Sequence, residues 1–215
     1  MHMFTQQVVT IGVVTPQHVS MLGTGFFISH NRIATTRHVV GNQNTGLVIL
    51  LPKINNINDY QNTSDNQCQL INALIIEIDP IKDLAILEIQ GELSGKLPPI
   101  GSFDEVDVSE KVGIFGYPHC VEGRRVLTYQ SAEIGAKILL STNDIMSKHA
   151  VINIQARPGQ SGSLVFSHRL NKVIGILVGA YAPDNSGGIS LGGINPRELH
   201  QTTHCISSEY LRDML

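Results

Sequence analysis

The stretch RPGQSGSLVF, residues 157–166, places Ser161 in a turn-forming sequence that leads into an apolar run. Gly159 and Gly162 bracket the serine, and glycine adopts backbone conformations that other residues avoid. A turn at Gly159 allows the backbone amides of Gly159 and Ser161 to converge on one point, as an oxyanion-binding site requires. The pattern indicates a nucleophilic serine, but glycine-serine turns without catalytic function are common, so this motif alone leaves both interpretations open.

Short apolar segments separated by turn-forming residues predict an all-β chain. The sequence contains 20 glycines and 9 prolines, which interrupt the apolar segments before a helical repeat can develop. In the segment LAILEI, residues 84–89, the side chains alternate between the two faces of an extended strand. Short strands at this spacing are typical of barrels and sandwiches. We expect strands at residues 6–14, 23–29, 32–36, 45–51, 72–78, 84–89, 111–117, 126–139, 150–156, 161–167 and 172–181.

Residues 90–110 combine glycine, serine, proline and acidic residues without a regular apolar pattern, and we expect them to connect two halves of the chain. The boundary is placed near residue 97, which gives one β-domain in residues 1–97 and a second in residues 98–215. The asparagine-rich residues 53–67 are expected to form a surface excursion. Near the end of the chain, Ser207 or Ser208 is a suitable N-cap for a short docked helix.

The composition excludes several classes of partner. The net charge is −3, the isoelectric point is near 6.3, and Arg124–Arg125 is the longest basic run, so no nucleic-acid surface is expected. Cys68, Cys120 and Cys205 cannot all pair with one another and lack the spacing of zinc or redox motifs, so we expect free thiols. No signal peptide is visible and no apolar run approaches the ~20 residues that span a bilayer, which predicts a cytoplasmic protein without a membrane segment.

His38 is the candidate general base. It follows the predicted strand 32–36 and precedes two valines, in the segment TTRHVV. Imidazole groups suit proton transfer because they ordinarily titrate near pH ~6.5. A histidine beside valines is nevertheless more often structural, so the local sequence does not decide the role of His38.

Two aspartates near the start of strand 84–89 are candidates for orienting that imidazole. Asp79 precedes Pro80 and has the character of a turn former. Asp83 opens the apolar strand, where a carboxylate can be anchored in a rigid element and partly desolvated. We assign the orienting role to Asp83, although an exposed carboxylate at the start of a strand fits the local sequence equally well.

The order histidine, aspartate, serine is that of chymotrypsin and differs from the orders of subtilisin and the α/β-hydrolases. The segments TTRHVV, KDLAILEI and GQSGSLVF with KVIGILVGAY resemble the three catalytic blocks of trypsin-like serine peptidases, especially bacterial HtrA/Deg peptidases and glutamyl endopeptidases. The likeness covers residues 20–182. It implies two six-stranded antiparallel β-barrels of the chymotrypsin type, with the active site between them and a short helix at the C-terminus.

The resemblance also implies a role for each site residue. Ser161 would be the nucleophile, His38 the general base and acid, and Asp83 the residue that orients His38. The amides of Gly159 and Ser161 would form the oxyanion hole, and Gly25 would be a packing glycine. The family's HtrA branch carries a PDZ domain after the peptidase domain, and we expect none here.

Substrate choice in such peptidases depends on the S1 pocket, beside the nucleophile turn and the late strand 172–181. None of the matching residues is acidic, so a buried lysine or arginine of the substrate would lack a counter-charge. We therefore expect cleavage after small or medium apolar residues. Leu177 stands near the place where glutamyl endopeptidases carry a histidine, which argues against glutamate. The expected substrate-binding residues are Gln155, Ala156, Val178, Gly179 and Ala180.

The predicted function is a serine endopeptidase that acts on a protein or peptide through an acyl-enzyme intermediate, without cofactor or metal. The alternative is a catalytically silent member of this fold that binds a peptide or partner protein. His200 and His204 could share one face of a helix beside Cys205, but no third ligand lies nearby in the sequence. Gln160 replaces the aspartate with which animal digestive peptidases capture a new N-terminus, so activation of that kind is not expected.

Overall fold

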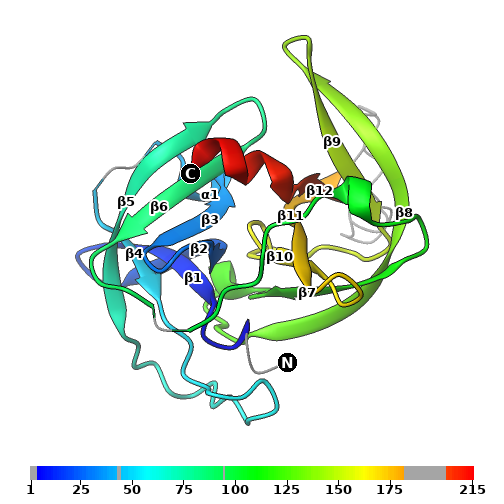
Figure 1. Ribbon diagram of the computed structural model, residues 1–215. Coiled ribbons are helices and arrows are strands. Elements are labelled where there is room, and N and C mark those ends of the chain that lie inside the picture. Colours follow the sequence, from blue (N-terminus) through cyan, green and yellow to red (C-terminus); the bar gives the residue numbers. More distant parts are fainter. Residues whose placement is uncertain (1–3, 43–44, 94, 182–201) are drawn as a thin grey trace, which may run out of the picture.

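The computed structural model describes residues 4–42, 45–93, 95–181 and 202–215, and its strands form two closed barrels (Figure 1). Each barrel consists of six antiparallel strands, as predicted. The first has the order β1-β2-β3-β6-β5-β4 and the second the order β10-β11-β12-β9-β8-β7. The first contains β1 (Val8–Val14), β2 (Val19–Phe27), β3 (Arg32–Thr36), β4 (Leu47–Leu50), β5 (Leu70–Asp79) and β6 (Leu84–Ile89); the second contains β7 (Lys111–Gly116), β8 (Thr128–Thr142), β9 (Ile145–Ile152), β10 (Leu164–Ser167), β11 (Lys172–Tyr181) and β12 (Thr202–Ser207).

The predicted strands are largely confirmed, with two corrections in the second barrel. Strand β9 begins at Ile145, well before the predicted start at residue 150, because it forms one long hairpin with β8. Strand β12 was not predicted, since its polar residues interrupt the apolar pattern. It also shows that the helix considered for His204 and Cys205 is wrong for those two residues, whereas His200 lies outside the described residues.

Strand β6 shows why the first barrel can pack against the second. Its alternating side chains are buried on both faces. Ala85 and Leu87 belong to the core inside the first barrel, while Leu84 belongs to the apolar cluster that joins the two barrels. The joining cluster also holds Phe4, whose ring lies 4.6 Å from the ring of Phe115 in the second barrel.

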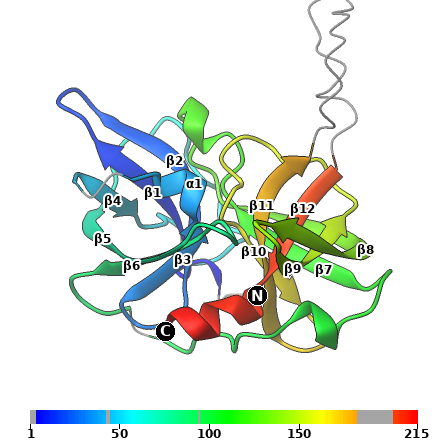
Figure 2. The same cartoon turned by 90° about the horizontal axis from the view of Figure 1, so that it is seen from above.

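Two segments, residues 90–110 and the C-terminal helix, connect the two barrels. Residues 90–110 connect the barrels and include the 3-10 helix η2 (Phe103–Glu105), and the boundary expected near residue 97 falls within this connection. The predicted C-terminal helix is the 3-10 helix η5 (Ser208–Met214), which lies across both barrels (Figure 2). Its Ser208 hydroxyl donates to the Val173 carbonyl at 2.8 Å.

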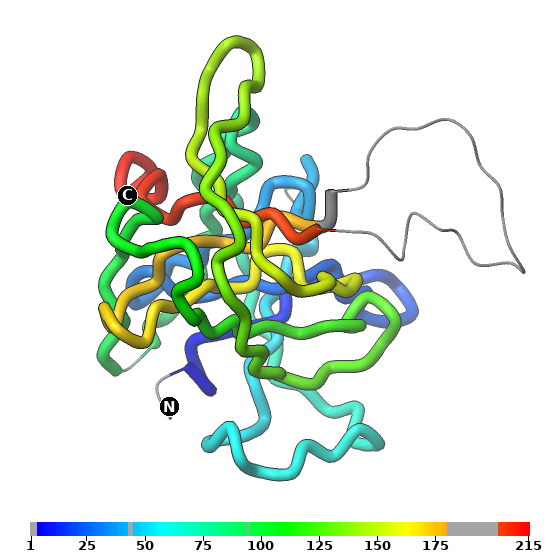
Figure 3. Tube along the Cα trace, turned by 90° about the vertical axis from the view of Figure 1, so that its right-hand side faces the viewer, coloured from blue at the N-terminus to red at the C-terminus, as the bar shows by residue number. Residues whose placement is uncertain are grey.

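Within the described residues, two parts of the chain extend beyond the barrels in opposite directions (Figure 3). One is the hairpin of β8 and β9. The other is the segment 51–69, which contains the asparagine-rich residues and forms turns without strand structure up to its last residue. The predicted surface excursion is therefore confirmed, and this segment becomes important for the cavity described below.

His149 on β9 is a buried imidazole in the second barrel. The residue is only 8% exposed, and its Nε2 atom lies 3.0 Å from the Ser147 hydroxyl. Its Nδ1 atom has no hydrogen-bond partner among the described residues. Burial lowers the pKa of His149 to about 4, and the neighbouring His204 acts in the same direction. The folded chain therefore holds His149 neutral.

This burial predicts a loss of stability in acid. The unfolded chain binds a proton at His149 near pH ~6.5, whereas the folded chain resists it down to about pH 4, so the free energy of unfolding should fall by roughly 3 kcal/mol across that interval. Urea unfolding at several pH values measures the slope. A His149→Gln variant should have a smaller slope, and an equal slope in both proteins would contradict the assignment to His149.

Candidate active site

His38 and Asp83 meet at the end of the first barrel. His38 lies in the single helical turn α1 (Arg37–Val40), directly after β3. Its Nδ1 atom is 2.5 Å from Asp83 Oδ2, and its backbone N–H donates to Asp83 Oδ1 at 2.9 Å. The Arg37 N–H donates to the Asp83 carbonyl at 2.9 Å. The carboxylate therefore fixes both the ring and the backbone of the histidine.

Asp83 was predicted to open strand β6. It instead occupies the last position of the turn directly before that strand. Its φ angle is 56°, in the left-handed region that non-glycine residues seldom adopt. The hydrogen bonds to α1 stabilise this conformation. Asp79, at the other end of the same turn, accepts hydrogen bonds from Ile81 N, Lys82 N and Lys82 Nζ, which confirms that it is a turn former.

Ser161 lies in a tight turn immediately before β10. Gly159 and Gly162 have φ angles of 90° and 85°, so both positions use the conformational freedom of glycine. A Cβ atom at Gly162 would lie 1.9 Å from the Thr24 carbonyl oxygen, which leaves no space for another residue. The Ser161 hydroxyl donates to the Val178 carbonyl at 3.0 Å. Within the described part of the chain, the hydroxyl has no other hydrogen-bond partner.

A single glycine separates the His38 turn from the Ser161 turn. A Cβ atom at Gly23 would lie 2.7 Å from Val39 Cγ2 on one side and 3.1 Å from the Ser161 carbonyl oxygen on the other. The two turns therefore approach each other across the width of one residue. Gly23 was not identified from the sequence, whereas the prediction of Gly25 as a packing glycine is supported by its tight contacts with Ile11 and Ile33.

The backbone amide of Gly159 is free to bind an anion. The Pro158 carbonyl accepts a hydrogen bond from His119 N at 2.6 Å. In a trans peptide the N–H points away from the carbonyl, so this bond directs the Gly159 N–H to the side opposite His119. Among the described residues, the amides of Gly159 and Ser161 donate to no protein acceptor. Both donors of the predicted oxyanion hole are thus available.

Thr24 holds the nucleophile turn against the first barrel. Its hydroxyl donates to the Gly159 carbonyl at 2.8 Å and accepts from Tyr117 N at 3.0 Å, while its own N–H donates to the Ser161 carbonyl at 2.9 Å. Gln160 is buried and donates to the Gln130 side chain at 2.5 Å. Thr24 was not predicted, because a threonine in a strand carries no signal of contacts this far along the chain.

Two titratable residues buried beneath the turn are uncharged. Burial raises the pKa of the Cys120 thiol to about 12, and burial also raises the pKa of Tyr117 well above its ordinary value. The Cys120 sulfur lies 3.7 Å from the Gly159 carbonyl oxygen. Cys120 is therefore a packing residue, and all three cysteines are free, as expected.

The expected S1 residues lie on or near β11. Val178 and Gly179 belong to this strand, and Val178 contacts Ser161 through its carbonyl. Ala156 N donates at 2.9 Å to the hydroxyl of Thr203 on β12, the strand that pairs with β11. Leu177 is fully buried in the core of the second barrel. Gln155 lies next to Ala156 in the chain, and the side chain of Ala180 lies outside the described part.

The residues that the structure describes contain no group of three histidine, cysteine or acidic side chains arranged to hold a metal ion. Their helices are all too short or too polar to cross a membrane.

Comparisons with known proteins place this geometry in context. Over 169 residues, the chain is 27% identical to a glutamyl endopeptidase of Staphylococcus epidermidis, covering 74% of this chain and 54% of the relative. The chain therefore spans about half the length of the curated relatives it matches.

Solved structures resemble the whole fold. The active form of the Rv3671c protease from M. tuberculosis has a TM-score of 0.68 and 23% identity, covering 97% of this chain and 79% of that one. The MamO protease domain from Magnetospirillum magneticum has a TM-score of 0.70 and 13% identity, covering 100% of this chain and 98% of that one. At these identities the likeness establishes the fold, which is the chymotrypsin-like arrangement of two barrels. Residues 23–176 match the family model of the trypsin-like peptidase domain, and the chain belongs to that family.

Proposed function

We propose that the chain is a serine endopeptidase in which Ser161, His38 and Asp83 form the catalytic triad. The observation that carries the proposal is that the Asp83 carboxylate accepts hydrogen bonds from both the ring and the backbone of His38, beside the turn that holds Ser161. A carboxylate that binds Nδ1 selects the tautomer in which Nε2 can accept a proton. The glutamyl endopeptidase relative and the protease structures support the same activity.

Catalysis requires the Ser161 hydroxyl to exchange the Val178 carbonyl for His38 as its acceptor. This exchange replaces one neutral hydrogen bond with another, so its cost is small. His38 then takes the hydroxyl proton while the serine oxygen attacks the substrate carbonyl carbon. The resulting oxyanion binds the amides of Gly159 and Ser161. His38 returns the proton to the leaving nitrogen, which breaks the peptide bond, and a water molecule hydrolyses the acyl-enzyme by the reverse use of His38.

We further propose cleavage after small or medium apolar residues, with Gln155, Ala156, Val178, Gly179 and Ala180 lining the pocket. In support, the side chain at position 177 is an apolar leucine buried in the core. A cytoplasmic location is likewise a proposal, supported by the three free thiols.

Replacing triad residues should remove turnover. We expect Ser161→Ala and His38→Ala to lose nearly all peptidase activity, and Asp83→Asn to lower kcat by about 10³- to 10⁴-fold, because the asparagine cannot select the same tautomer. Peptide hydrolysis and labelling by a fluorophosphonate measure the effect. Asp79→Asn is the matched control, since that carboxylate binds Lys82, and it should retain activity. A folded wild-type chain that neither labels nor hydrolyses would favour the silent binding module.

Thr24→Val should loosen the nucleophile turn. The substitution leaves the buried Tyr117 N–H without its acceptor and removes a donor from the Gly159 carbonyl, so the free energy of unfolding should fall by about 2–4 kcal/mol. Displacement of the oxyanion donors should lower kcat by about ten- to a hundredfold. Thr10→Val is the control: the Thr10 hydroxyl is buried without a partner among the described residues, so a methyl group there should be neutral or stabilising.

Peptide-library cleavage tests the pocket. Alanine, valine or leucine should be preferred before the cleaved bond, because a charged side chain would enter the pocket without a counter-charge. A strong preference for arginine or lysine would contradict this proposal. A preference for glutamate, the residue in the name of the Staphylococcus epidermidis relative, would contradict it equally.

A further inference from the structure

A cavity of about 530 Å³ lies outside the triad, between the segment 51–69, the beginning of β2 and the loop that follows β7. Its walls are held together by specific hydrogen bonds. The Gln61 side chain exchanges two hydrogen bonds with the backbone of Leu127, each 2.8 Å long. The Arg125 guanidinium donates to the carbonyls of Leu51 and Gln67, at 3.4 and 3.0 Å. The segment is thus fixed to the second barrel, and the cavity is preformed.

The cavity begins beside the nucleophile turn. Strand β2 passes Ser161 at Thr24, and Met21 and Val19, on the same strand, line the cavity. Tyr117 also lines it, and its carbonyl oxygen would lie 2.8 Å from a Cβ atom at Gly159. The cavity therefore adjoins the oxyanion turn on the side of the first barrel.

The opposite side of Ser161 is formed by β11. The serine hydroxyl contacts the Val178 carbonyl, and Gly162 N donates to the Leu177 carbonyl. The proposed S1 residues lie on this side, so it takes the part of the substrate before the cleaved bond. A peptide that crosses Ser161 from β11 toward β2 consequently directs its leaving part into the cavity.

The cavity is basic in a chain whose net charge is −3. Three lysine or arginine side chains line it, together with His18 and one acidic side chain, Asp65. Asp65 neutralises Lys53 at 2.6 Å, and hydrogen bonding to Lys53 lowers the pKa of Asp65. Among the described residues, Arg125 donates to carbonyls and forms no ion pair. Arg124 is exposed and likewise makes no ion pair within the described residues. Two guanidinium groups of the cavity wall therefore have no ion-pair partner in this part of the chain.

We infer that this cavity binds acidic residues of the substrate on the leaving side of the cleaved bond. The inference rests on the proposed function, since the endopeptidase reaction defines which side leaves. The apolar wall of Val19, Met21 and Tyr117 accommodates the substrate backbone and small side chains, while Arg124 and Arg125 attract the carboxylates.

Binding to the Ser161→Ala chain tests the inference without turnover. Three fluorescent peptides share one apolar residue before the cleavable bond: one has three glutamates after it, one has three glutamines after it, and one has the glutamates before it. The first should bind about three- to tenfold more tightly than the others, as expected for exposed charge pairs. The difference should shrink in 1 M NaCl, where charges are screened beyond ~3 Å.

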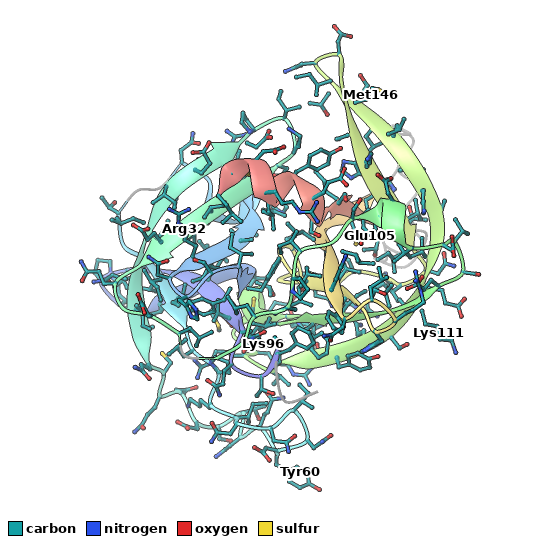
Figure 4. The ribbon with its side chains drawn as sticks, in the orientation of Figure 1. Arg32, Tyr60, Lys96, Glu105, Lys111 and Met146 are labelled. Carbon is teal, nitrogen blue, oxygen red and sulfur yellow. The ribbon has the colours of Figure 1, made fainter. Side chains whose placement is uncertain are left out.

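Arg124→Glu in the same background should abolish the preference for the first peptide. Lys111→Glu makes the same change of charge on β7, far from Tyr60 of the cavity (Figure 4), and should preserve the preference. Equal dissociation constants for the three peptides, or a preference unchanged by Arg124→Glu, would overturn the inference. If the preference is present but the wild-type chain hydrolyses none of the peptides, the acidic-peptide site stands and the proposed endopeptidase function fails.

Discussion

The contact between Thr24 and the nucleophile turn is the constraint on which the site depends. Backbone and hydroxyl of this one residue bind the carbonyls of Gly159 and Ser161, which lie in the other barrel. The contact is so close that position 162 has space only for glycine. The two barrels therefore meet through backbone atoms of fixed geometry, and the positions of His38 and Ser161 follow from this meeting more than from the conformation of either side chain.

Polarity at the site is confined to a few groups. Tyr117 and Cys120 are buried and uncharged beneath the turn, and the carbonyls of the turn are occupied by Thr24 and His119. The N–H groups of Gly159 and Ser161 are left as donors without protein acceptors among the described residues. An oxyanion formed there in the proposed reaction would meet these two oriented N–H dipoles.

The family and the fold could be predicted from the sequence because both leave a signal in the order and spacing of residues. The order of His38, Asp83 and Ser161 indicated the trypsin-like family, which the family match confirms, and the barrels follow from regular alternation in strands such as β6. Strand β12 escaped prediction because polar residues interrupt its apolar pattern, including the buried Thr203 and Ser207.

The supporting residues escaped for a different reason. Thr24, Gly23 and His119 act through backbone contacts with residues far away in the chain, and a threonine, glycine or histidine in isolation gives no indication of such a partner. The left-handed conformation of Asp83 is likewise set by its contact with α1 rather than by its neighbours in sequence.

The place of β12 in the second barrel has a consequence for biosynthesis. This strand lies between β9 and β11, so the barrel that contains Ser161 cannot close until residues 202–207 are present. During translation, His38, Asp83 and Ser161 are therefore all synthesised before the second barrel can be completed. The nascent polypeptide passes through an interval in which these three side chains exist but their arrangement in the finished fold does not.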